Sequence, residues 1–214
     1  MNEDELLLNI ENNSLDFLAK LGIEVSKPAE DNNTNSIPIP SITNVVCSSK
    51  LNCKLNLNLL SSQVRNSEYS PKLFTGLVIR IRQPKATGIV FSTGSLVVTG
   101  IGVETDAKTA TRKIARTIMK AGNNVRLSHF KIDNVCGTVD VNGQVHLHHF
   151  QNKHSFFATL ELELFPSLVY RLLEPKVTFM VFRNGKVNIV GAKSTAILHE
   201  AFQKFYLIMR EFIV

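Results

Sequence analysis

Alternation of apolar and polar residues along the chain predicts a β-rich protein with two long helices. Residues 88–100, GIVFSTGSLVVTG, form two apolar runs around a Ser-Thr-Gly turn, and residues 179–191, FMVFRNGKVNIVG, form two more around Arg-Asn-Gly. Glycine supplies the positive φ that hairpin turns often need. Helical spacing of apolar residues follows each hairpin, from about 105 to 122 and from about 195 to 212.

The two hairpins belong to an internal repeat. A shift of 91 residues superimposes 74–102 on 165–193 without a gap, and the segments ITNVV (42–46) and IDNVC (132–136) match at a shift of 90. Each half is therefore predicted to begin with a strand that carries an asparagine. A short helix, several hairpin-linked strands and a long helix follow in each half.

Both faces of the first hairpin are apolar. Alternate residues of a strand face opposite ways. The two faces consist of Ile89, Phe91, Val97 and Thr99 on one side and Val90, Leu96 and Val98 on the other. Because one face of an antiparallel sheet usually meets water, the second face needs a cover, either the other half of the protein or a bound partner. The duplication and the phenylalanine beside each turn favour a partner.

Charge is distributed unevenly along the chain, whose formal net charge is +6. Residues 1–37 hold eight acidic and two basic residues, which predicts an acidic, mobile N-terminal tail with a short amphipathic helix as a further hypothesis. Repeats at 38–126 and 127–214 follow. They are basic, with 22 basic and 10 acidic residues, and this excess favours a polyanion as partner: nucleic acid first, an acidic protein or a membrane surface second.

Several other classes of protein find no support in the sequence. No run of 18 apolar residues and no signal peptide occur, so we expect neither a membrane span nor export. Cys47, Cys53 and Cys136 lack a metal-ligand spacing and are interpreted as reduced, buried thiols. The histidine cluster at 146–154 is placed in a loop-rich region without a zinc pattern. Because phosphate loops and nucleophile motifs are also absent, we predict neither an enzyme nor a bound cofactor or metal.

From about Ile39 to Phe212, the chain resembles the saddle domain of the TATA-box-binding protein (TBP) family. The shared landmarks are RNSEYSPKLF (65–74), IRIRQPKATGIVFSTG (79–94), FKIDNVCG (130–137), LFPSLVYR (164–171) and EPKVTFMVFRNGKV (174–187). The resemblance implies an α+β fold: two pseudo-symmetric repeats form a saddle-shaped, curved antiparallel sheet of about ten strands, with four helices on the convex face. It also implies a nuclear, general transcription initiation factor that binds and bends A/T-rich TATA promoter DNA through the minor groove and nucleates the preinitiation complex.

The resemblance assigns wedge roles to four phenylalanines. In the family, phenylalanines at both ends of the sheet enter base steps of the minor groove and unstack them. The matching positions are Phe74 with Phe91 in the first repeat and Phe165 with Phe182 in the second. The bending of the DNA and the cost of unstacking, roughly a few kcal/mol per base step, are likewise known for this family and are implied by the resemblance.

Asn44 and Asn134 match the family's central asparagines, whose amides donate to the A N3 and T O2 acceptors of the minor groove. The resemblance also implies an apolar floor around them and basic residues near the phosphates, which supply affinity and salt dependence. The floor positions are Val46, Cys136, Ile89, Met180, Val97 and Thr99. The basic positions are Arg80, Arg171, Lys176, Lys186 and Lys193, with Gly102 at the position of Lys193 in the first repeat.

The floor of the second repeat departs from the family. Asn188 and Val190 stand where the family has valine and threonine, the pair kept at Val97 and Thr99. Our hypothesis is that the second half-site is read less strictly, with Asn188 accepting a hydrogen bond from the guanine N2 amino group. The departure also leaves open an alternative function, a TBP-related interaction protein with weak or altered DNA specificity that acts mainly by binding shared transcription factors.

Two surfaces are expected to bind proteins. Basic residues recur along the first long helix, where a solvated helix face is the alternative; they are Lys108, Arg112, Lys113, Arg116 and Lys120. Glu161 and Glu163 match acidic positions that meet transcription factor IIB at the second stirrup loop. The family implies transcription factors IIA and IIB, TBP-associated factors and polymerase-specific initiation factors as partners. Self-association through the concave face is a further hypothesis for the DNA-free protein.

Overall fold

Strands and helices recur in the same order in two halves of residues 37–214, which are the residues that the computed structural model describes. The first half contains β1 (Ser41–Lys50), α2 (Leu57–Gln63), β2 (Ser67–Glu68), β3 (Leu77–Arg82), β4 (Lys85–Val90), β5 (Ser95–Ile101) and α3 (Asp106–Lys120). The second contains β6 (Ser128–Asp140), α4 (Leu147–Lys153), β7 (Ala158–Leu160), β8 (Leu168–Leu172), β9 (Val177–Val181), β10 (Lys186–Ala192), α5 (Thr195–Met209) and the 3-10 turn η1 (Arg210–Phe212). The predicted tail and its short helix lie outside the described residues, except Ile37, which packs against the core.

The strands form one ten-stranded antiparallel sheet in the order β2-β3-β4-β5-β1-β6-β10-β9-β8-β7. The first strands of the two halves, β1 and β6, lie side by side at its centre, and their pairing runs from Ser41 opposite Thr138 to Lys50 opposite Ser128. The two halves are therefore joined by a shared ladder of strands. This arrangement confirms the predicted α+β fold of two pseudo-symmetric repeats.

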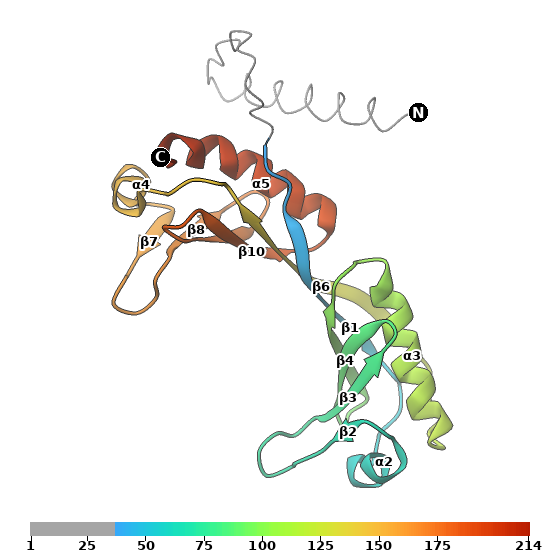
Figure 1. Ribbon diagram of the computed structural model, residues 1–214. Helices are drawn as coiled ribbons and strands as arrows, with labels where there is room; N and C mark the ends of the chain where they lie inside the picture. The colour runs from blue at the N-terminus through green and yellow to red at the C-terminus, as the bar shows by residue number, and fades with distance from the viewer. Residues whose placement is uncertain (1–36) are drawn as a thin grey trace, which may run out of the picture. The chain divides into compact units, whose positions relative to one another are not determined.

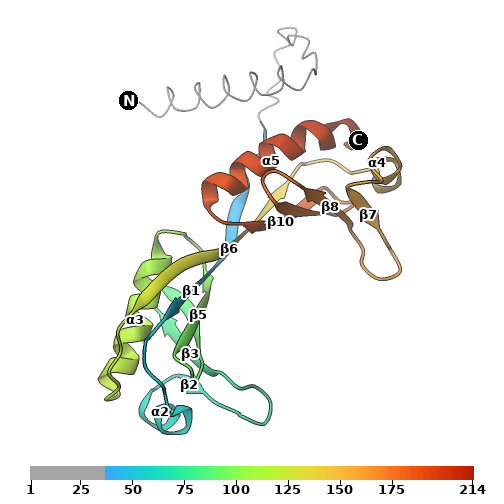
Figure 2. The ribbon, with the colours of Figure 1, turned by 180° about the vertical axis from the view of Figure 1, so that it is seen from behind.

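The sheet curves, and the long helices α3 and α5 cover its convex side (Figure 1; seen from behind in Figure 2). Helix α3 packs against β1, β3, β4 and β5, whereas α5 packs against β6 and β10. The register between β1 and β6 shifts at three points, between Ile42 and Asn44, Val46 and Cys47, and Ser48 and Lys50. Irregularities of this kind bend a strand and increase its twist, so they contribute to the curvature at the centre.

Both long helices begin close to their predicted starts. In α3 the buried residues Ala107, Ala110, Ile114 and Ile118 recur every three or four positions, which places them on one face. In α5 the side chain of Ser194 accepts a hydrogen bond from the Ile197 amide at 3.2 Å and caps the helix. The second helix was expected to continue to residue 212, but the α-helix ends at Met209 and the last turn is 3-10.

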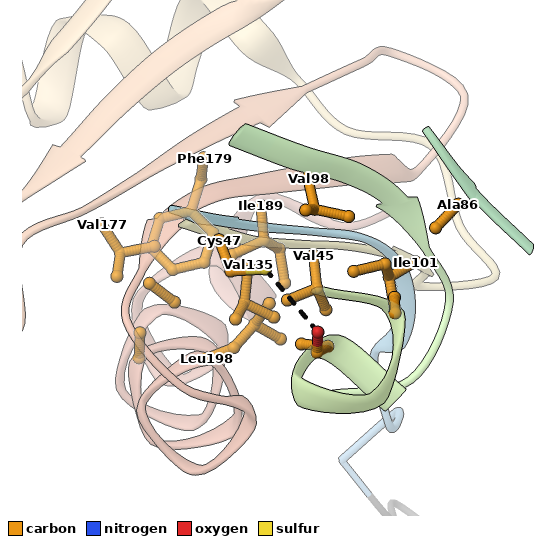
Figure 3. Close-up of a cluster of buried hydrophobic side chains, with 14 of the residues drawn as sticks. Val45, Cys47, Ala86, Val98, Ile101, Val135, Val177, Phe179, Ile189 and Leu198 are labelled. Atoms are coloured by element: carbon orange, nitrogen blue, oxygen red, sulfur yellow. Dashed lines mark hydrogen bonds between the residues drawn. The ribbon is translucent and has the colours of Figure 1, made fainter. Parts of the chain in front are cut away.

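The two repeats fill the space under their helices differently. At the centre, aliphatic residues such as Val45, Val135 and Leu198 pack together (Figure 3). The second repeat adds buried aromatic rings, and Phe179 stacks on Phe205 with ring centroids 4.1 Å apart. In the first repeat, α3 lies directly on the backbone of β4, because a Cβ at Gly88 would come within 2.7 Å of Ile114 Cδ1.

Two predictions about reactive side chains need correction. Cys47 is buried, but Cys53 and Cys136 are partly exposed, so the interpretation of three buried thiols was wrong for two of them. The histidine cluster lies on and beside helix α4 and not in a loop. Within the described part of the chain, no group of side chains is arranged to hold a metal ion.

His154, at the end of α4, belongs to the aromatic core of the second repeat. Its ring contacts Phe150 with centroids 5.4 Å apart and Tyr170 at 6.2 Å. Burial is the main reason why the pKa of His154 lies below its ordinary value, and the positive charge of Lys153 acts in the same direction, opposed by Glu211. We therefore assign His154 a packing role in the core.

None of the helices between residues 37 and 214 is long and apolar enough to cross a membrane.

The hairpin turns require glycine, as the sequence indicates. Gly94 and Gly185 both have a φ of +84°, in the left-handed region. We expect Gly94→Ala to lower the free energy of unfolding by at least about 1–2 kcal/mol, because alanine is strained there and its Cβ would overlap the carbonyl oxygen of Cys53. Urea unfolding measures the change. Gly102→Ala is the control, since its Cβ would have no neighbour within 4 Å; equal midpoints for both variants would contradict the prediction.

Candidate nucleic-acid interface

The sheet face opposite the helices carries the predicted floor. Along each strand these residues are half-buried and alternate with fully buried residues that face α3 or α5. At the centre, Asn44 lies opposite Cys136 and Val46 lies opposite Asn134 in the β1–β6 ladder. The structure places on this face Asn44, Val46, Ile89, Val97, Thr99, Asn134, Cys136, Met180, Asn188 and Val190.

Each repeat pairs two phenylalanine rings beside its outer strands. The ring centroids of Phe74 and Phe91 are 6.2 Å apart at 66°, and those of Phe165 and Phe182 are 6.1 Å apart at 61°. Phe74 and Phe165 each remain 45% exposed. Each pair joins one residue from the loop before β3 or β8 to one from the turn before β5 or β10. The sequence predicted these pairs, and the structure brings both together with nearly the same geometry.

The amides of the two central asparagines have a fixed orientation. Asn44 Oδ1 accepts from the Gly100 amide, and Asn134 Oδ1 accepts from the Gly191 amide, both at 2.8 Å. A backbone N–H only donates, so the oxygen of each side chain is identified and its NH₂ group points the other way. Positive φ values of +78° and +102° at these glycines are part of this arrangement.

The NH₂ groups of these asparagines retain donor capacity. Asn44 Nδ2 contacts Thr99 Oγ1, and Asn134 Nδ2 contacts Cys136 Sγ, each at 3.3 Å. An amide nitrogen carries two N–H donors, so one donor of each asparagine stays available on the open face. The centre of the face therefore presents a symmetric pair of hydrogen-bond donors among apolar neighbours.

Asn188 has a partner that the sequence did not reveal. Thr138 Oγ1 lies 3.2 Å from Asn188 Oδ1 and 3.3 Å from the carbonyl oxygen of Val187. Thr138 lies directly opposite Asn188 in the β6–β10 ladder but 50 positions away in the chain. The oxygen expected to accept from guanine thus already has a contact with a hydroxyl group.

Basic residues border the face, and some are engaged within the protein. Arg80 forms an exposed ion pair with Glu68 at 3.0 Å. Lys193 Nζ donates to the carbonyl oxygen of Asp133 at 2.6 Å. The other predicted phosphate-side residues, Arg171, Lys176 and Lys186, are exposed. The structure thus supplies cations in both repeats, although Gly102 provides none at the position of Lys193.

Asp133, next to the central Asn134, is an acidic group that the sequence analysis did not single out. Burial alone would raise the pKa of Asp133, but hydrogen bonds from Ser48 and Lys131 lower it below its ordinary value. The charges of Lys131 and Lys193 act in the same direction. The carboxylate is therefore ionised at neutral pH and offsets part of the positive charge near the centre.

The two predicted protein-binding surfaces are solvent-accessible. On α3, all five basic residues are exposed, and Lys113 Nζ donates to the Gln83 carbonyl oxygen in the turn between β3 and β4. Glu161 and Glu163 are exposed in the loop between β7 and β8, where Leu164 is 80% exposed. Both surfaces combine charge with exposed apolar area, because Met119 on α3 is also 50% exposed.

An apolar sheet face with fixed amide donors at its centre and cations at its border is suited to reading DNA with a sheet. The fold and this face define a sheet-based DNA-binding protein. A family described as "Transcription factor TFIID (or TATA-binding protein, TBP)" matches residues 39–121 and 129–212. The chain belongs to this family, the TATA-box-binding proteins.

Individual relatives support this assignment. The TATA-box-binding protein of Candida albicans is 37% identical over 202 residues, which cover 92% of this chain and 85% of that protein. TATA-box-binding protein 2 of Arabidopsis thaliana is 39% identical over 195 residues, covering 91% and 98% of the two chains. The solved structure of Methanococcus jannaschii TBP superimposes with a TM-score of 0.70 at 33% identity, covering 81% of this chain and 99% of that one.

Cys136 offers a direct test of which face binds DNA. Burial raises the pKa of Cys136, and the hydrogen bond from Asn134 offsets part of this rise. Iodoacetamide should therefore label it slowly at neutral pH and faster as the pH rises. We expect an A/T-rich duplex to suppress labelling of Cys136, quantified by peptide mass spectrometry. Cys53, whose pKa is also raised by burial, lies outside the floor and is the internal control; equal suppression at both thiols, or at neither, would contradict the prediction.

Proposed function

We propose that the protein is a nuclear, general transcription initiation factor that binds A/T-rich TATA-type promoter DNA through the minor groove, bends it and nucleates the preinitiation complex without catalysis. The observation that carries this proposal is the pair of phenylalanine clusters. Each repeat holds two rings about 6 Å apart in nearly the same orientation, with one ring 45% exposed. Partly exposed rings at both ends of an apolar face suit insertion into two base steps.

The centre of the face favours A·T pairs. The minor-groove edge of A·T carries only acceptors, whereas G·C adds the N2 amino donor. Asn44 and Asn134 present N–H donors there because the Gly100 and Gly191 amides occupy their oxygens. Donors and apolar side chains match an acceptor-lined groove, and the cations at the border meet the phosphates.

The exposed helix and loop surfaces support binding of further transcription factors. We assign the basic surface of α3 to acidic regulators and assembly factors, including transcription factor IIA, TBP-associated factors and polymerase-specific initiation factors. The β7–β8 loop, with Glu161 and Glu163, is assigned to transcription factor IIB. The apolar face also suits self-association of the protein in the absence of DNA.

The departure at Asn188 and Val190 is the observation that favours a second function. This second function is that of a TBP-related interaction protein, which binds DNA weakly and acts mainly by competing for shared transcription factors. A bending assay on TATA and non-TATA duplexes at stated salt separates the two functions, because only the first requires a stable bent complex.

Removing a wedge should reduce bending. Because Phe165 is 45% exposed, Phe165→Ala should leave the fold intact. We expect a smaller bend, read by energy transfer between dyes at the duplex ends, and affinity lower by about tenfold or more, equivalent to roughly 1.4 kcal/mol. Phe74→Ala should behave alike. Phe156→Ala is the control, since Phe156 is 89% exposed between α4 and β7 and outside both pairs; unchanged bending by Phe165→Ala would refute the wedge role.

Charge reversal on α3 should separate protein binding from DNA binding. Lys108→Glu with Arg112→Glu places negative charge on the convex side, away from the floor. We expect loss of the ternary complex with transcription factor IIA in a gel-shift assay, with little change in binding to DNA alone. Arg210→Glu, at an exposed position beyond α5, is the control. If DNA binding falls as much as ternary assembly, the assignment of this surface is wrong.

A further inference from the structure

The floors of the two repeats differ in one cross-strand pair. In the β6–β10 ladder, Thr138 lies opposite Asn188. At the equivalent place in the β1–β5 ladder, Ser48 lies opposite Val97. All four side chains are half-buried on the open face. The second repeat therefore has a side-chain amide where the first has a valine.

The contact with Thr138 orients that amide. Thr138 Oγ1 donates to Asn188 Oδ1 at 3.2 Å and shares the same proton with the carbonyl oxygen of Val187 at 3.3 Å. With its oxygen turned toward this hydroxyl, Asn188 directs its NH₂ group away from Thr138. On its other side, Asn188 lies opposite the apolar Met180 of β9. Among residues 37–214 no acceptor contacts Asn188 Nδ2. An amide donor on an apolar floor is costly to bury without a partner, so its most favourable complex is with a ligand that supplies an acceptor there.

We propose that Asn188, positioned by Thr138, donates a hydrogen bond to adenine N3 or thymine O2 and is a third specificity-determining amide beside Asn44 and Asn134. This inference rests on the proposed function. In this inference Asn188 is the donor, whereas in the sequence-based hypothesis it accepts a hydrogen bond from guanine. A donor facing the guanine N2 amino group is unfavourable, so the second repeat reads its half-site more strictly at one base pair.

Base analogues that change single minor-groove atoms test whether Asn188 donates or accepts. 3-Deazaadenine removes the adenine N3 acceptor, 2-thiothymine replaces the thymine O2 acceptor with a weaker sulfur acceptor, and 2,6-diaminopurine adds an N2 amino donor, while all three leave the major-groove edge unchanged. Each adenine and each thymine of a TATA duplex is replaced in turn, on both strands, and dissociation constants are measured at one salt concentration. For the wild type we expect 3-deazaadenine or 2-thiothymine to weaken binding roughly three- to tenfold at one position beneath the second repeat, the size of one neutral hydrogen bond.

Variants assign that position to Asn188. In Asn188→Val the penalty at this position should vanish, while the penalties at the positions read by Asn44 and Asn134 remain. Thr138→Val keeps the shape and removes the hydroxyl, so it should reduce the penalty at this position only. A merely structural role of Thr138 would change every position together. Unfolding midpoints show whether each variant is folded, and Asn188→Val alone decides the proposal if Thr138→Val is not.

The first repeat supplies a matched gain-of-function variant. Val97→Asn, made together with Asp133→Ala, places an amide opposite Ser48 and frees the Ser48 hydroxyl, which otherwise donates to Asp133, to take the role of Thr138. Relative to Asp133→Ala alone, we expect a new roughly three- to tenfold penalty for 3-deazaadenine or 2-thiothymine at the symmetry-related position of the duplex. This variant adds a contact, so a general loss of stability cannot produce the expected result.

The outcomes distinguish this inference from the proposed function. If the wild type binds and bends TATA DNA but Asn188→Val has the same position-specific penalties, the inference is wrong and the proposed function stands. If 2,6-diaminopurine beneath the second repeat tightens wild-type binding, Asn188 accepts and the inference is also wrong. If no A/T-rich duplex is bound, both fall.

Discussion

The pairing of β1 with β6 is the interaction on which the rest of the structure depends. It joins the two repeats into one sheet, and its register sets Asn44 opposite Cys136 and Val46 opposite Asn134. The irregularities in this ladder bend the sheet at its centre. The same strands are held on the opposite face by buried residues such as Val45 and Val135. Curvature, central donors and core therefore depend on one pair of strands.

Backbone amides orient the central polar side chains of the open face and satisfy their oxygens. Asn44 and Asn134 would be poor residues for the middle of an apolar sheet, but each oxygen is satisfied by a glycine amide at 2.8 Å. That bond removes the acceptor and leaves the donor. An apolar surface that presents only hydrogen-bond donors favours ligands that present acceptors, whereas an apolar surface without polar groups would not distinguish between such ligands and others.

Much of the fold could be predicted from the sequence, because a gapless repeat constrains topology as well as secondary structure. The helix from Asp106, the glycine turns and the phenylalanine positions follow from local patterns. What could not be predicted depends on contacts between distant segments. Thr138 orients Asn188 across 50 residues, and no local pattern reports that register. The helical setting of the histidines likewise depends on packing around Phe150, whereas the placement of Cys136 on the floor was already implied by the resemblance.

The differences between the repeats have unequal consequences for DNA recognition. The aromatic core around Phe179 and Phe205, and the close approach of α3 to Gly88, change how each helix sits but lie on the side of the sheet that the helices cover. In the proposed complex, only differences on the floor or its border change what a base pair or a phosphate meets. Because the paired wedges and central asparagines are nearly symmetric, they give little preference for either orientation on a site. An asymmetric group on the floor, such as Asn188 opposite Thr138, makes the two orientations unequal in energy at any site whose halves differ.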